Sequence, residues 1–181
     1  MDKINIQMLR KVLNKNARLF QLKMIDKKRD LYFMKEDYHF FTVIENEVFR
    51  WELQIAIDVS SKGLIHSMVF LHPVVITDET KSSYIEFANA ANLYLGSAMG
   101  RFWVNDENDF CYESYLPEFL MENEKELEQQ LFDIPFAHFR DCLSPLMKMR
   151  NREWEDDKAK EYLHQLRDEG YVNNEEYGLW D

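Results

Sequence analysis

The stretch FANAANLYLGSAMGRFWVNDENDFCYESYL, residues 87–116, contains the pattern that decides the fold. Its first half has the spacing of an amphipathic helix that ends at Gly96. Asn89 and Asn92 lie one turn apart at the edge of the apolar stripe of this helix. Short amide side chains in such places usually bond to nearby backbone groups, so we interpret both as architectural residues where helix passes to strand, in preference to ligand-binding residues. The stripe itself consists of Tyr84, Phe87, Ala88, Ala91 and Leu95.

The second half of the stretch predicts a β-hairpin with a three-residue loop, Asp106 to Asn108, in which Asn108 is left-handed. Alternation places Phe102 against the helices and Trp103 on the opposite face. In the register that this loop implies, opposite charges meet and apolar residues meet. The pairs are Arg101 with Glu113, Phe102 with Tyr112, and Val104 with Phe110.

A second hairpin is predicted upstream, where the hydrophobic period is two. Residues 48–59, VFRWELQIAIDV, alternate between apolar and polar side chains, which indicates a strand with one buried face. A two-residue turn at Glu45 and Asn46 would connect it to a strand that begins at Tyr38. A slip of one residue would bring Glu52 opposite Phe40, so burial favours one register. That register pairs Phe40 with Trp51, Thr42 with Phe49, and His39 with Glu52.

A third strand follows at residues 64–73, LIHSMVFLHP, and both of its faces are apolar. The pattern therefore leaves its register open, but it predicts that both faces are covered.

The flanking segments are predicted to be helical. An apolar stripe of helical spacing marks a first helix and comprises Ile4, Met8, Leu9, Val12 and Leu13. Residues 19–25, LFQLKMI, either continue this helix or form a short strand. Asn123 with Glu126 predicts the start of a later helix, with a kink at Pro135. Ser144 and Pro145 predict the start of a further charged helix that ends near Gly170.

The resulting fold class is α+β with an antiparallel sheet. The order is helix, three strands, helix, two strands and helix, plus an extra C-terminal helix. We expect one domain over residues 1–150, followed by a charged helix and tail over residues 151–181.

This order, together with the quoted motif, resembles the type III secretion chaperone-like fold. Within that fold the chain resembles the YbjN-type family of bacterial regulators, in which paired asparagines precede an arginine-containing strand, an acidic turn and a second strand. Asn89 and Asn92 match the paired asparagines, Arg101 the strand arginine, and Glu113 the acidic residue of the next strand. The resemblance implies frequent dimerisation and a role in protein binding or regulation, and it carries no catalytic residues.

Composition bounds the function further. The 181 residues carry a formal charge of −11, with 33 acidic and 22 basic residues, which disfavours nucleic acid as a partner. Cys111 and Cys142 are too few for a disulfide framework. We find neither an apolar signal at the start nor a run of roughly 20 apolar residues. We therefore expect a cytoplasmic protein without a membrane segment.

Motifs for chemistry are weak. His138 and Cys142 lie four residues apart on one helical face, but a cysteine among phenylalanines is usually inert core. His66 and His72 would need a further ligand to bind zinc. A di-iron site would need more than the single glutamate and histidine at residues 161 and 164. We expect no catalytic residue, metal or cofactor.

Two classes of function remain for a protein that we expect not to be an enzyme. The first is a chaperone-like or regulatory module that binds another protein and forms a homodimer, with Trp103, Tyr115, Phe41 and Val43 as the binding residues. The second is an acidic inhibitor or immunity-type protein that neutralises a basic partner. Salt separates the two classes, because only the second should lose affinity steeply as ionic strength rises.

Overall fold

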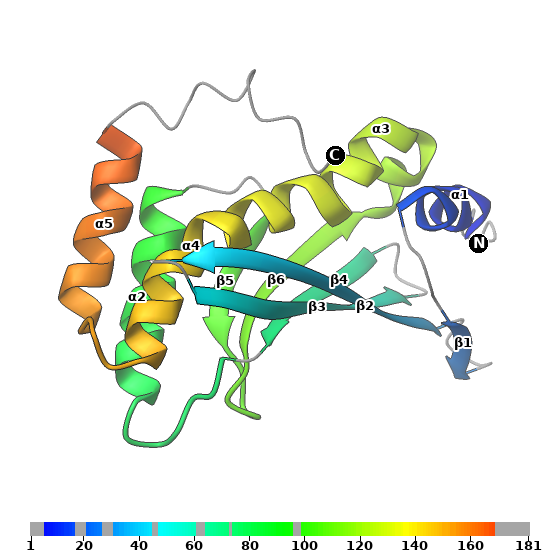
Figure 1. The fold of residues 1–181 in the computed structure, drawn as a ribbon. Coiled ribbons are helices and arrows are strands. Elements are labelled where there is room, and N and C mark those ends of the chain that lie inside the picture. The colour runs from blue at the N-terminus through cyan, green and yellow to red at the C-terminus, as the bar shows by residue number, and fades with distance from the viewer. Residues whose placement is uncertain are drawn as a thin grey trace.

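The computed structural model describes residues 6–16, 21–26, 31–44, 47–60, 64–72, 74–95 and 99–168. Over these ranges the chain is α+β, with a six-stranded antiparallel sheet and a layer of helices packed on one of its faces (Figure 1). The strands are β1 (Gln21–Asp26), β2 (Leu31–Ile44), β3 (Glu47–Ser60), β4 (Leu64–His72), β5 (Gly100–Val104) and β6 (Phe110–Pro117). The α-helices are α1 (Ile6–Asn16), α2 (Lys81–Tyr94), α3 (Glu124–Glu128), α4 (Ile134–Arg150) and α5 (Asp156–Asp168).

Both predicted hairpin registers are confirmed. β2 pairs with β3 so that Phe40 lies opposite Trp51, Thr42 opposite Phe49 and His39 opposite Glu52. The turn residues 45 and 46 lie outside the described part of the chain. β5 pairs with β6 so that Arg101 lies opposite Glu113, Phe102 opposite Tyr112 and Val104 opposite Phe110. Asn108 has a φ of 65°, the left-handed conformation that the three-residue loop requires.

The sheet has one strand more than the three predicted before α2. Residues 21–26 form β1 and pair with the first residues of β2. They overlap residues 19–25, for which the sequence allows either helix or strand. β2 begins at Leu31 and not at Tyr38. The added first residues of β2, Leu31 to Lys35, supply the backbone groups with which β1 pairs.

β4 lies inside the sheet, in the strand order β1-β2-β3-β4-β6-β5. Its buried residues Ile65, Val69 and Leu71 share the face that carries Phe102 and Tyr112. Met68 and Phe70 lie half-buried on the other face. The helix layer thus decides which of two apolar faces is the core face, a choice that the hydrophobic pattern could not make.

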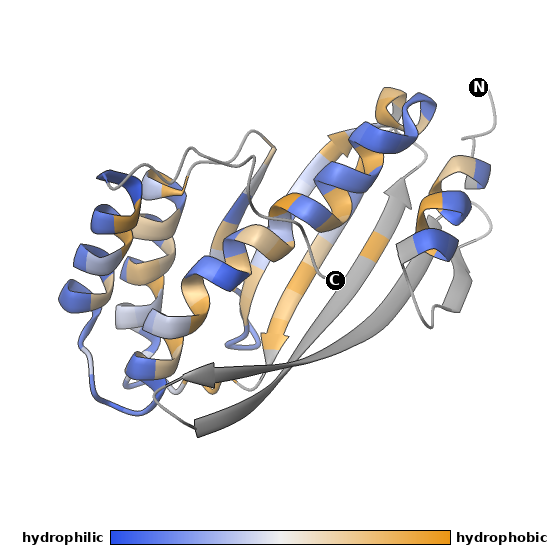
Figure 2. Cartoon of the chain, turned by 45° about the horizontal axis from the view of Figure 1, so that its top comes forward, coloured by the Kyte–Doolittle hydropathy of each residue, from blue (hydrophilic) through white to orange (hydrophobic). Residues whose placement is uncertain are grey.

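The core lies between the sheet and the helices. Phe139 of α4 packs on Phe102 of β5, with the ring centroids 5.2 Å apart, and Phe87 of α2 packs on Phe110 of β6 at 5.8 Å. Figure 2 shows the apolar side of α4 turned towards the strands. α1 adds a buried stripe to the same core, and α5 packs against α2. The buried residues of these two helices are Leu9, Val12 and Leu13 in α1, and Ala159 and Leu163 in α5.

The later helices begin partly where the sequence predicted. The side chain of Asn123 accepts a hydrogen bond from the backbone N–H of Glu126, the predicted cap. A 3₁₀ turn (Glu118–Glu122) precedes α3, and a π-helical turn (Gln129–Asp133) joins α3 to α4 just before Pro135. No helix in the described part is long and apolar enough to cross a membrane.

The prediction that Pro145 starts a new helix is wrong. Pro145 lies inside α4, and this helix ends only at Arg150. Arg152, two residues later, has a φ of 60°. Proline removes one helical hydrogen bond. Leu143 and Leu146 are both buried beside it, so continuing the helix across the core outweighs that loss.

Candidate functional site

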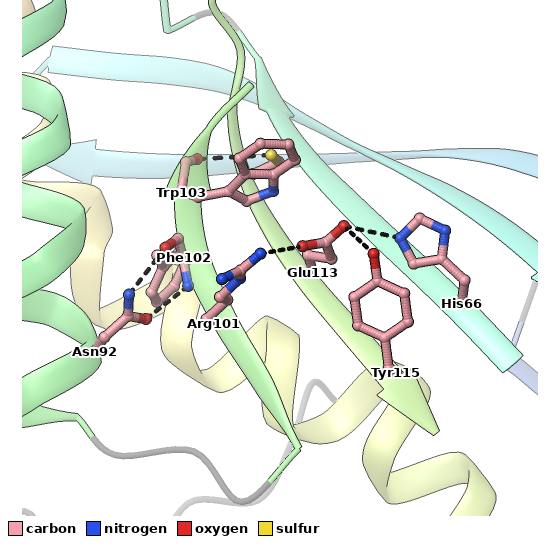
Figure 3. A network of polar contacts seen from close by, with 8 residues as sticks. His66, Asn92, Arg101, Phe102, Trp103, Glu113 and Tyr115 are labelled. Carbon is pink, nitrogen blue, oxygen red and sulfur yellow. Dashed lines mark hydrogen bonds and ion pairs between the residues drawn. The ribbon is translucent and has the colours of Figure 1, made fainter. Parts of the chain in front are cut away.

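Asn92 joins α2 to β5. Its side-chain Nδ2 donates to the backbone oxygen of Phe102 at 2.9 Å, and the Phe102 N–H donates to its Oδ1 at 2.6 Å (Figure 3). β5 is the last strand on its side of the described sheet. The amide therefore bonds to outward-facing backbone groups that a further strand would otherwise satisfy. Asn89, three residues earlier, is exposed on α2.

On the opposite, outer face of the sheet, the carboxylate of Glu113 has three polar partners. Its Oε2 accepts from Nη2 of Arg101 at 3.1 Å, and its Oε1 accepts from the Tyr115 hydroxyl at 2.9 Å. His66 Nε2 lies 3.0 Å from the same Oε1. Figure 3 shows the three side chains converging on Glu113 from β4, β5 and β6. We name these four residues the Glu113 cluster.

The strand order explains this convergence. β6 lies between β4 and β5, so Glu113 has a neighbour on each side. Arg101 is directly opposite it in β5, and His66 is directly opposite Tyr115 in β4. The His66 and Tyr115 rings stack, with their centroids 4.6 Å apart and their planes at 8°. Tyr115 is thus held by its ring face and by its hydroxyl.

The electrostatics keep Glu113 charged. Burial raises the pKa of the Glu113 carboxyl, because its side chain is only 5% exposed. Hydrogen bonds from Tyr115, Arg101 and His66 outweigh this effect and hold the pKa below its usual value. The same bond to Glu113 raises the pKa of the Tyr115 phenol. The cluster therefore contains a buried carboxylate whose charge is stabilised by donors from three strands.

The exposure of the predicted binding residues is uneven. Tyr115 is 52% exposed, and Leu64, on the same face, is 43% exposed. Trp103 is only half-buried, with its indole Nε1 shielded from solvent and the Arg101 guanidinium 5.9 Å from its ring centroid. The Cys111 thiol donates to the Trp103 backbone oxygen at 3.5 Å, and burial raises its pKa. Of the predicted binding residues whose side chains the structure describes, Tyr115 is thus the more exposed.

Phe41 and Val43 lie elsewhere in the sheet. They pair with Arg50 and Val48, near the end of the β2–β3 hairpin. Pairing with β4 begins only at Glu52, so this end of the hairpin extends beyond β4. The side chains of Phe41 and Val43 lie outside the described part of the structure.

The buried groups of α4 do not form an activated pair. Burial lowers the pKa of His138 to about 4, and burial raises the pKa of the Cys142 thiol well above its usual value. Both groups are therefore uncharged at neutral pH, whereas a nucleophilic cysteine needs a stabilised thiolate. Within the described residues, no three His, Cys, Asp or Glu side chains are placed to hold a metal ion.

Sequence reasoning missed His66 as a member of the Glu113 cluster. The sequence suggests for His66 only a role as a zinc ligand, together with His72. The β4–β6 pairing brings His66 to Tyr115, although 49 positions separate them in the chain (115 − 66). The register of β4 against β6 would have placed His66 next to Tyr115. The sequence does not define that register, because both faces of β4 are apolar.

Comparison of the chain with models of protein families, with curated proteins and with solved structures finds no match. The interpretation of the site therefore depends on its geometry.

Proposed function

We propose that the protein is a non-enzymatic protein-binding module, chaperone-like or regulatory, with a type III secretion chaperone-like fold of the YbjN type. The order α1, β2 to β4, α2, β5 and β6, α4 supports this proposal, with β1 and α5 as additions. The partner is another protein, and the chain forms a cytoplasmic homodimer. Light scattering tests the dimer, because a monomer has a mass of 21.9 kDa.

The binding surface in this proposal is the outer face of the sheet around Tyr115. The observation that carries it is an exposed aromatic side chain held in one orientation by a buried, charged carboxylate. Aromatic anchors contribute much of the binding free energy of protein interfaces. An anchor already fixed before binding loses less conformational entropy when the partner arrives.

Affinity capture tests the surface. The tagged protein, a Tyr115→Ala variant and a Leu93→Ala variant are incubated with lysate of the source organism, and bound proteins are compared by quantitative mass spectrometry. Leu93 is the matched control, since it is 70% exposed on α2, away from the outer face. We expect a protein that the wild type and Leu93→Ala retain and Tyr115→Ala loses.

Equal retention by all three forms, each shown to be folded by circular dichroism, would refute the proposed surface. Repeating the capture at low and high salt distinguishes the classes of function. Retention that changes little with salt supports an apolar contact. A steep loss with salt would point instead to an acidic inhibitor of a basic partner.

A further inference from the structure

We propose that Glu113 is a positioning residue, whose buried carboxylate fixes the orientation of Tyr115 and thereby sets the affinity of the outer face for its partner. This inference rests on the proposed function, because it concerns the same surface.

Glu113 contacts the residues of the outer face but is itself almost fully buried. Its side chain is 5% exposed, whereas the Arg101 side chain is 63% exposed and the His66 side chain 29%. A partner can therefore touch the three donors but hardly the acceptor that holds them. Loss of the carboxylate frees the Tyr115 hydroxyl and leaves the stacking contact with His66 to hold the ring.

Fold stability alone does not account for a charged residue here. Removing a carboxylate from water costs much of what its ion pair returns, so an apolar side chain of similar volume would stabilise a sheet about as well. The charged residue does differ in one respect. It brings donors from β4, β5 and β6 to a single point and gives each a defined direction.

The first measurement follows the Tyr115 phenol and needs no partner. Protein with ¹³C-labelled tyrosine rings is titrated by NMR, and Tyr115→Phe assigns the signal. The pKa of the Tyr115 phenol is raised mainly by the hydrogen bond to Glu113, while the nearby Arg101 charge lowers it. In Glu113→Gln we expect this pKa to fall towards its usual value, and in the exposed control Glu122→Gln we expect it to stay.

The second measurement uses the protein that the capture experiment identifies as dependent on Tyr115. Ordering one free side chain costs an amount that corresponds to a loss of affinity of about three- to tenfold. We expect this loss for Glu113→Ala, because alanine leaves the Tyr115 hydroxyl without the acceptor that glutamine would still provide. In a Tyr115→Phe background the same substitution should change the affinity little, because the hydroxyl through which Glu113 acts is already absent.

The outcomes separate the two ideas. An unchanged Tyr115 pKa in folded Glu113→Gln would show that Glu113 does not position Tyr115, whatever the partner. A changed pKa with unchanged affinity would refute the link to binding, as would equal losses in the two backgrounds. If no captured protein depends on Tyr115, the proposed function fails and the affinity claim with it, while the phenol titration still tests the contact between Glu113 and the Tyr115 hydroxyl.

Discussion

Replacing Asn92 by alanine should destabilise the domain, whereas the same change at Asn89 should not. Asn92 bonds to both backbone groups of Phe102, and alanine leaves that N–H and C=O without this partner at the edge of the sheet. Asn89 is exposed on the same helix. The two substitutions change helix propensity equally, so their difference isolates the contact between α2 and β5.

The magnitude follows from the two lost bonds. A backbone group left without a partner costs about 1–3 kcal/mol when buried, and the partial burial of this pair places each near the lower end. Alanine recovers about 0.5 kcal/mol, because it is the better helix former. We therefore expect Asn92→Ala to lower the free energy of unfolding by about 1.5 kcal/mol. Asn89→Ala should leave it unchanged or raise it by about 0.5 kcal/mol.

Urea unfolding followed by circular dichroism measures both values, provided that the slopes agree with the wild type. Asn92→Asp is an informative third variant. A carboxylate can accept from the Phe102 N–H but cannot donate to its oxygen, so this variant should not restore wild-type stability. Free energies for Asn92→Ala and Asn89→Ala within about 0.5 kcal/mol of each other would refute the reasoning.

Two further predictions concern the faces of the sheet and the interior of α4. Phe102 is 3% exposed, so Phe102→Asp should bury a charge without a partner and unfold the domain; half-buried Trp103 should tolerate the same change with a folded domain, and the reverse result by circular dichroism would contradict the assigned faces. Burial lowers the pKa of His138 to about 4, so its contribution to stability is present above about pH 6.5 and lost as the pH falls towards 4. As the pH falls over that window, the free energy of unfolding of the wild type should decrease by about 3 kcal/mol relative to that of His138→Phe. If urea unfolding gives the same difference between the two proteins at every pH, His138 does not titrate as expected. Burial raises the pKa of Asp141 to about 6, which favours the folded state as the pH falls, and this opposing effect cancels because both proteins contain Asp141.

The sequence by itself determined the two hairpins. In the first hairpin, the alternation over residues 48–59 favours a single register. In the second, a single register over residues 101–113 pairs opposite charges with each other and apolar side chains with each other. Such information is local, because a slip of one residue turns every side chain of a strand to the other face. The helix before β5 was equally readable from its stripe.

The tertiary structure decided the features that depend on distant parts of the chain. Residues 21–26 form a strand because β2 supplies a pairing edge, and Pro145 stays inside α4 because its neighbours are buried in the core. In both places the local conformational preference of the residues is outweighed by contacts made in the folded protein. Burial is a property of the assembled fold, so a local sequence pattern does not reveal it.

The same division applies to the candidate site. The sequence indicated the Arg101–Glu113 pair, since both residues belong to one hairpin. It could not show that Asn92 bonds to Phe102 while Asn89 is exposed. The two asparagines lie one helical turn apart on the same side of the helix, so the sequence pattern does not distinguish them. Nor could it place His66 beside Glu113. That contact exists only because β4 pairs with β6, and sheet pairing between distant strands is set by packing and not by local pattern.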